Sequence, residues 1–103
     1  MTLTNRYAAL VVSVGLAVGA TQVHAYTGEH LAGAAKIKIA QARAIALKAH
    51  PGKITDEELE KEPGGSGLRY SFDILVGTIT QEVGVDAKTG RVLENKPEGA
   101  NPD

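Results

Sequence analysis

The sequence from Leu68 to Asn95, LRYSFDILVGTITQEVGVDAKTGRVLEN, contains the clearest strand pattern in the chain. Its first part alternates large apolar residues with polar ones, which is the two-residue period of a strand with one buried face. The alternation resumes after Gly77, and Asp86 then opens a tight turn, DAKTG, whose glycine is suited to a left-handed backbone. The stretch therefore predicts three consecutive strands, over residues 68–74, 78–85 and 91–95.

A short helix is expected before these strands. Apolar and small residues recur at helical spacing and form one stripe: Ile39, Ala42, Ile45, Ala46 and Ala49. Pro51 disfavours helical backbone at the residue before it, and Gly52 can adopt a positive φ. The helix is therefore expected to end at His50.

The segment 53–62 fits two interpretations. Residues 55–58, TDEE, match a capping box, which favours the start of a helix. Leu59 is the only apolar residue between Ile54 and Pro63, however, so a helix here would have no face to bury. A strand that places Thr55, Glu57, Leu59 and Lys61 on one side fits only slightly better.

The N-terminal residues have the organisation of a secretory signal peptide. Arg6 precedes an apolar stretch of about thirteen residues, and small residues stand at the positions that signal peptidase reads, ending at Ala25. A membrane span would need roughly 20 apolar residues. We expect residues 1–25 to be removed between Ala25 and Tyr26, residues 26–36 to form a flexible lead-in, and the polar residues 96–103 to form a disordered tail.

The order of these motifs resembles the PepSY family, a small module of exported bacterial proteins and protease propeptides. The residues that carry the resemblance are Ala42, Ile45-Ala46-Leu47, Pro51-Gly52, Glu58-Leu59-Glu60, Tyr70-Ser71-Phe72-Asp73-Ile74 and Val85-Asp86-Ala87-Lys88-Thr89-Gly90-Arg91-Val92. Two positions depart from the family pattern. Lys38 stands where relatives often place a Ser or Thr helix cap, and Gly84 stands where a larger residue is usual and marks a bulge or a close contact.

The resemblance implies an α+β fold over residues 37–95, with one N-terminal helix packed on an antiparallel sheet of three to four strands. It also favours the strand interpretation of residues 53–62. Relatives are proposed to inhibit or regulate peptidases in the cell envelope, and no catalytic residues are known for the family. We therefore expect a non-enzymatic exported binding module, in the periplasm or outside the cell, whose partner is a protein such as a peptidase. The alternative is an envelope sensory or assembly module that binds a membrane protein or a small ligand without inhibiting proteolysis.

Composition excludes several other classes of protein. The net charge is −1, or −2 once cleavage leaves 10 basic and 12 acidic residues, which gives no basic face for nucleic acid. The chain has no Cys, and the two histidines that would remain after cleavage, His30 and His50, are too few and too far apart for a zinc site. The acidic run 56–62 lacks the spacing and the internal glycine of a calcium loop, so it predicts a solvated acidic edge. We expect no enzyme activity, no metal and no cofactor.

Two surfaces are candidates for contacting a partner. The first is the acidic segment 53–62, represented by Glu58 and Glu60, and the second is the hairpin 77–92, represented by Lys88 and Arg91. Strand addition at a sheet edge would supply main-chain hydrogen bonds to the partner. Tyr70 and Phe72 share one strand face and are expected in the core rather than on a recognition surface.

Overall fold

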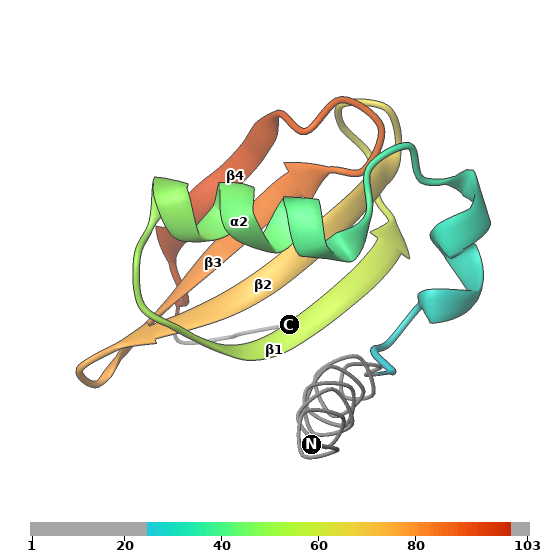
Figure 1. Ribbon diagram of the computed structural model, residues 1–103. Helices are drawn as coiled ribbons and strands as arrows, with labels where there is room; N and C mark the ends of the chain where they lie inside the picture. The colour runs from blue at the N-terminus through green and yellow to red at the C-terminus, as the bar shows by residue number, and fades with distance from the viewer. Residues whose placement is uncertain (1–24, 100–103) are drawn as a thin grey trace, which may run out of the picture.

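A single helix lies across one face of a four-stranded antiparallel sheet in the computed structural model, which describes residues 25–99 (Figure 1). The elements are the 3₁₀-helix η1 (Glu29–Ala34), the helix α2 (Ile39–Ala49), and the strands β1 (Lys53–Lys61), β2 (Leu68–Val76), β3 (Ile79–Asp86) and β4 (Val92–Pro97). The strands lie side by side in the order β1-β2-β3-β4, so neighbours in sequence are neighbours in the sheet. The α+β fold expected from the sequence is confirmed.

The core lies between α2 and the sheet. Alternate residues of β2 are buried on this side, and Tyr70 and Phe72 are each only 1% exposed, as expected from the sequence. Their rings stack with centroids 6.5 Å apart, and the Tyr70 hydroxyl donates to the Ile37 carbonyl at 2.8 Å. Ala42 and Ala46 of α2 are fully buried, because their small side chains let the helix approach the sheet closely.

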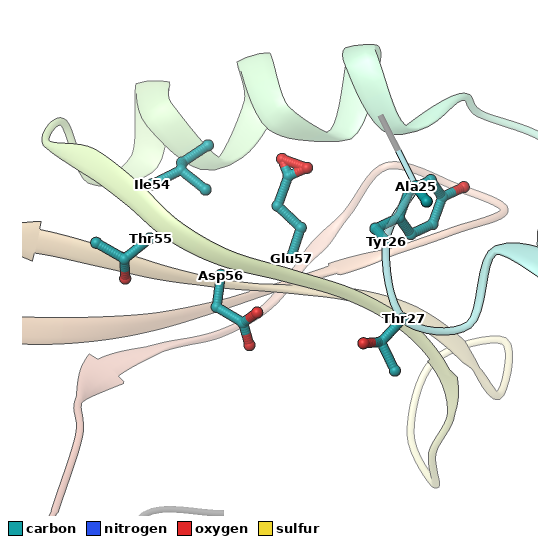
Figure 2. Close-up of a pocket in the computed structure, with 7 residues that line it drawn as sticks. All are labelled: Ala25, Tyr26, Thr27, Ile54, Thr55, Asp56 and Glu57. Carbon is teal, nitrogen blue, oxygen red and sulfur yellow. The ribbon is translucent and has the colours of Figure 1, made fainter. Parts of the chain in front are cut away.

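Residues 53–61 form a strand, so the strand interpretation of this segment is confirmed. The expected alternation of its side chains is interrupted, however, by an irregularity in the register with β2. Ile54 lies opposite Ile74 and Asp56 lies opposite Asp73, which leaves Thr55 as an additional residue in a bulge. Ile54, rather than Thr55, therefore shares the helix side of the sheet with Glu57 (Figure 2). Glu57 there binds Arg43 of α2 through two hydrogen bonds of 2.8 Å, which tie the edge strand to the helix.

The residues that precede α2 run along the outer edge of β1. Thr27 forms a parallel bridge with Glu58, and its carbonyl accepts a hydrogen bond from the Leu59 N–H at 2.8 Å. Gly28 has φ +86°, and a Cβ atom at this position would overlap the Leu59 carbonyl oxygen. Only glycine therefore lets the chain leave the edge of β1 and begin η1.

The final strand continues to Pro97, two residues past the expected end at Asn95. Gln81 lies opposite Pro97, and the Glu98 N–H donates to the Thr80 carbonyl at 2.8 Å, so pairing with β3 holds the start of the segment expected to be a tail. The expected signal peptide up to residue 24 and the last residues, 100–103, lie outside the described part of the chain.

Helix α2 begins without the usual cap side chain. Lys38 occupies the N-cap position, and its ammonium group has no lone pair with which to accept a backbone N–H. The side chain of Gln41 instead accepts the Lys38 N–H at 2.9 Å, which is the reciprocal half of a capping box. The departure from the family pattern at Lys38 is therefore compatible with a helix that begins at Ile39.

The turn between β3 and β4 is organised by a buried carboxylate, that of Asp86, which is 1% exposed. One of its oxygens, Oδ1, accepts the backbone N–H groups of Lys88 and Thr89 at 2.8 and 3.1 Å and the Ser66 hydroxyl at 2.8 Å. The other, Oδ2, accepts the Ser66 N–H at 2.6 Å. Burial raises the pKa of a carboxyl group, but these hydrogen bonds outweigh it and hold the pKa of Asp86 below its ordinary value.

Candidate functional site

The face of the sheet opposite α2 is a shallow hollow of about 240 Å³, and no helix in residues 25–99 covers it (Figure 1). Acidic residues dominate its lining. Asp56, Glu58, Glu60 and Glu62 come from β1 and the residue after it. Asp73, Glu82, Glu94 and Glu98 come from the other strands and the residue after β4. We call this surface the acidic face. Within residues 25–99, it holds eight of the 11 acidic residues but only two of the 10 basic ones, Arg69 and Lys96.

The register places like charges directly opposite one another on the acidic face. Asp56 of β1 lies opposite Asp73 of β2, and Asp73 lies opposite Glu82 of β3. Like charges in opposite positions destabilise a sheet. This row of paired residues across the sheet ends with a favourable pair, because Glu82 lies opposite Lys96 of β4.

Small residues stand at one level of the two central strands, and only Ser71 of them lines the hollow. In the row after the acidic one, Ser71 lies opposite Gly84, with Glu58 and Glu94 on the flanking strands. A Cβ atom on Gly84 would lie 2.9 Å from Arg69 Cδ and 3.3 Å from Glu94 Cβ. The register with β4 also shifts between Gly84 and Val85. The expected close contact at this glycine is confirmed, whereas the additional residue of the neighbouring bulge is Leu93 of β4.

The two cations of the acidic face both bind the same carboxylate on its β4 side. Arg69 Nη1 lies 3.5 Å from Glu94 Oε1, and Lys96 Nζ lies 3.2 Å from Glu94 Oε2. Arg69 also donates to the Pro63 carbonyl at 3.2 Å, while its buried Nε has no hydrogen-bond partner among the described residues. The positive charge on this face is therefore held close to Glu94.

Glu60 shows how crowded the carboxylates are on the β1 side. Burial raises its pKa above the ordinary value, the Ser71 hydroxyl lowers it through a hydrogen bond of 2.9 Å, and the carboxylates of Glu62 and Glu58 raise it further. The net shift is upward, so the electrostatic environment of Glu60 opposes its ionisation. An added positive charge nearby would favour the ionised form.

A second concave region, of about 590 Å³, lies between the lead-in and the start of β1 (Figure 2). It is lined by Ala25, Tyr26 and Thr27 on one side and by residues 54–57 on the other. The carboxylates of Asp56 and Glu57 point to opposite sides of β1 in Figure 2, and Glu57 binds Arg43. The ionisable groups of this cleft therefore do not converge on one point, as a reacting group would require.

The part of the chain that the structure describes holds neither a metal site nor a membrane span. In the range 25–99, no group of three or more His, Cys, Asp or Glu side chains is arranged to hold a metal ion. No helix in that range is long and apolar enough to span a bilayer.

Comparison with known proteins places the chain in a family. Residues 36–96 match the family described as "Peptidase propeptide and YPEB domain", known as PepSY, and this range is more than half of the 103-residue chain. The chain belongs to the PepSY family. The matched range contains α2 and all four strands, whereas η1 and the residues on the edge of β1 precede it. No curated protein and no solved structure gave a match.

The structure brings together only two of the four surface residues chosen from the sequence. Glu58 and Glu60 line the acidic face of the PepSY domain, whereas Lys88 and Arg91 lie exposed in the turn between β3 and β4 and do not line the hollow. The two residues at the expected cleavage site, Ala25 and Tyr26, lie in the cleft beside β1. Cleavage between them stays a prediction.

The contribution of the later strands to the acidic face was missed from the sequence. Asp73 and Glu82 occupy the polar positions of the alternating pattern in β2 and β3, opposite the acids of β1. The signal was present, because every second residue of a one-sided sheet faces away from the core. The acidic residues of separate strands can be assigned to one surface only when the register between the strands is known.

Proposed function

We propose that this PepSY domain is a non-catalytic, exported binding module that restrains a peptidase by covering part of its surface. The observation that carries the proposal is the acidic face: an uncovered, strongly charged sheet surface in a domain whose family is described as a peptidase propeptide. A propeptide acts by contact, and an uncovered sheet face offers a broad area for such contact.

The geometry favours the face of the sheet over the edge of β1 as the contact surface. Thr27 already occupies part of this edge through its bridge with Glu58, and the bulge at Thr55 interrupts the regular spacing of backbone groups. Bulges and covered edges both oppose the addition of another strand. Occlusion by the acidic face is therefore the preferred mechanism, with Lys88 and Arg91 as candidate contacts from the neighbouring turn.

A non-catalytic role agrees with the arrangement of the ionisable groups. The buried carboxylate of Asp86 is fully engaged in holding a turn, and Glu57 binds Arg43. Both carboxylates thus hold parts of the fold together, which is a structural role.

The test is capture of the partner. Tagged protein would be recovered from the envelope and secreted fractions of the producing cell, and its specific companions identified by mass spectrometry. The proposal predicts that a peptidase is recovered and that its activity falls as more of the purified protein is added. Recovery of a sensor or a transporter, with proteolysis unaffected, would contradict it and favour a sensory or assembly module.

A further inference from the structure

We infer that the surface that docks on the acidic face is cationic: a segment of a partner protein whose Lys and Arg side chains reach into the hollow. This inference rests on the proposed function as a binding module and names the chemistry of the partner. Its first support is the imbalance of charge, because eight acidic and two basic residues line one uncovered face of a chain whose net charge is only −1.

Charge is segregated between the two sides of the molecule. Only two of the ten described basic residues line the acidic face, whereas four precede or belong to α2 on the other side: Lys36, Lys38, Arg43, which binds Glu57, and Lys48. The acidic face thus carries a concentrated negative charge although the whole chain is close to neutral. Such an arrangement attracts and orients a cationic partner surface, most strongly within a Debye length of about 8 Å at physiological salt.

The register indicates that the acidic face is maintained at some cost to stability. Asp56 opposite Asp73, and Asp73 opposite Glu82, are placements that a sheet selected only for stability would avoid. Local rules of this kind are broken mainly at functional sites. A row of partner cations above these carboxylates would turn the repulsion into attraction.

The shape of the hollow suits long, flexible cationic side chains. Ser71, a small residue, lines the middle of the hollow between carboxylates of the neighbouring strands, whereas the Arg69 side chain lies against Gly84. The two internal cations both bind Glu94 on the β4 side. The β1 side, with Glu58, Glu60 and Glu62, is where we place the strongest contacts of the partner. The raised pKa of Glu60 agrees with a surface that favours an added positive charge.

The test uses a defined cationic probe, an octa-lysine peptide blocked at both ends, titrated into the full ¹⁵N-labelled chain. The inference predicts that amide signals of the acidic face, such as those of Ser71 and Gly84, shift in a saturable way that weakens as NaCl is raised from about 0.05 to about 0.5 M, because salt screens exposed charges. Signals of Ala42 and Ala46 in α2 should shift little. Octa-glutamate is the matched probe of opposite charge and should leave the acidic face unchanged.

Two variants distinguish the effect of the acidic face on octa-lysine binding from the effect of net charge. Replacing Glu58→Gln together with Glu60→Gln should weaken octa-lysine binding about three- to tenfold, as expected for the loss of two partly exposed ion pairs. Glu29→Lys changes the net charge by the same amount at an exposed site on η1, outside the hollow, and should weaken binding much less. Thermal unfolding of each variant establishes that the fold is kept.

The inference would be overturned by octa-lysine shifts that centre on α2, by equal weakening in the double variant and in Glu29→Lys, or by binding of octa-glutamate beside Arg69. Salt-sensitive self-association that the Gln variant abolishes would also overturn it, because the basic helix side of a second copy would then be the occupant. The experiment needs no peptidase. A peptidase that is not restrained would contradict the proposed function alone, whereas octa-lysine that fails to bind would contradict the cationic partner alone.

Discussion

Asp86 is the residue on which the local structure at one end of the sheet depends most. Its carboxylate joins the glycine-rich loop before β2, through Ser66, to the turn after β3, through Lys88 and Thr89. The next residue, Ala87, accepts the N–H groups of Lys36 and Ile37 and so anchors the chain that leads into α2. This network accounts for the Asp in the family motif, because one buried carboxylate satisfies donors from two loops.

Asp86→Asn is expected to lower the free energy of unfolding by about 2 kcal/mol at pH 7, the usual cost of a buried donor left without an acceptor. The amide nitrogen of Asn would replace Oδ2 or Oδ1, and each of these oxygens now accepts at least one N–H group. Urea denaturation measures the change. Glu29→Gln, at an exposed site, should change stability by less than about 0.5 kcal/mol.

The same residue should make stability depend on pH. The pKa of Asp86 is lower in the folded protein than its ordinary value of 3.8, so the unfolded chain binds more protons as the pH falls below about 4. The contribution of Asp86 is therefore complete above that pH and decreases below it. The stability difference between wild type and Asp86→Asn should shrink from pH 5 towards pH 2; a constant difference would contradict this assignment.

At the scale of elements, β1 combines three tasks that a single pattern in the sequence cannot separate. It contributes Leu59 to the core, holds Glu57 against Arg43 of the helix, and presents Asp56, Glu58 and Glu60 on the acidic face. The bulge at Thr55 makes this possible, because it brings Ile54 to the helix side without moving Asp56 from the other side.

Asp56→Thr is expected to stabilise the protein by about 0.5 kcal/mol, because it removes a like charge opposite Asp73 and adds a residue that favours strands. Glu58→Thr is the matched control, since Glu58 lies opposite Ser71 on the same strand and face. Urea denaturation at low salt compares the two. An equal gain from both would show that the opposed charges cost nothing.

The lead-in is a short element attached to β1 at few points. Gly28→Ala should release it, because the new Cβ would overlap the Leu59 carbonyl oxygen and the backbone has φ +86°. The Leu59 amide, which donates to Thr27, should then exchange its hydrogen about tenfold faster or more, as expected for an added strain of about 1–2 kcal/mol. Gly33→Ala, where a Cβ would meet nothing within 4 Å, should leave this exchange rate unchanged.

The helix, the central strands and the buried aromatic residues could be predicted because each depends on a local period or a local turn. The close contact at Gly84 was predictable for a similar reason, since a glycine inside a strand commonly marks a bulge or a close contact. The bulge at Thr55 and the continuation of β4 to Pro97 depend on the partner strands, which the sequence does not specify. The acidic face was recognised only along β1, because the register between strands decides which acidic residues of the other strands lie beside those of β1.

At the scale of the whole molecule, the PepSY domain has two unlike sides. One is covered by α2 and carries basic residues around the helix, and the other is the acidic face, which no element of the described chain covers (Figure 1). A small domain gains little stability from a charged, uncovered face whose register opposes like charges. We therefore interpret the acidic face as the surface that the domain keeps for its partner.

The role of the acidic face can be tested by measuring the affinity of the captured partner for three forms of the protein: wild type, Glu58→Lys combined with Glu60→Lys, and Glu29→Lys. If the acidic face is the contact surface, the double variant should lose affinity by about tenfold or more, in line with two contacts changed from attraction to repulsion at roughly 1 kcal/mol each. Glu29→Lys should bind like wild type. Unchanged affinity of the double variant, with its fold intact, would contradict the account and move the contact to another surface.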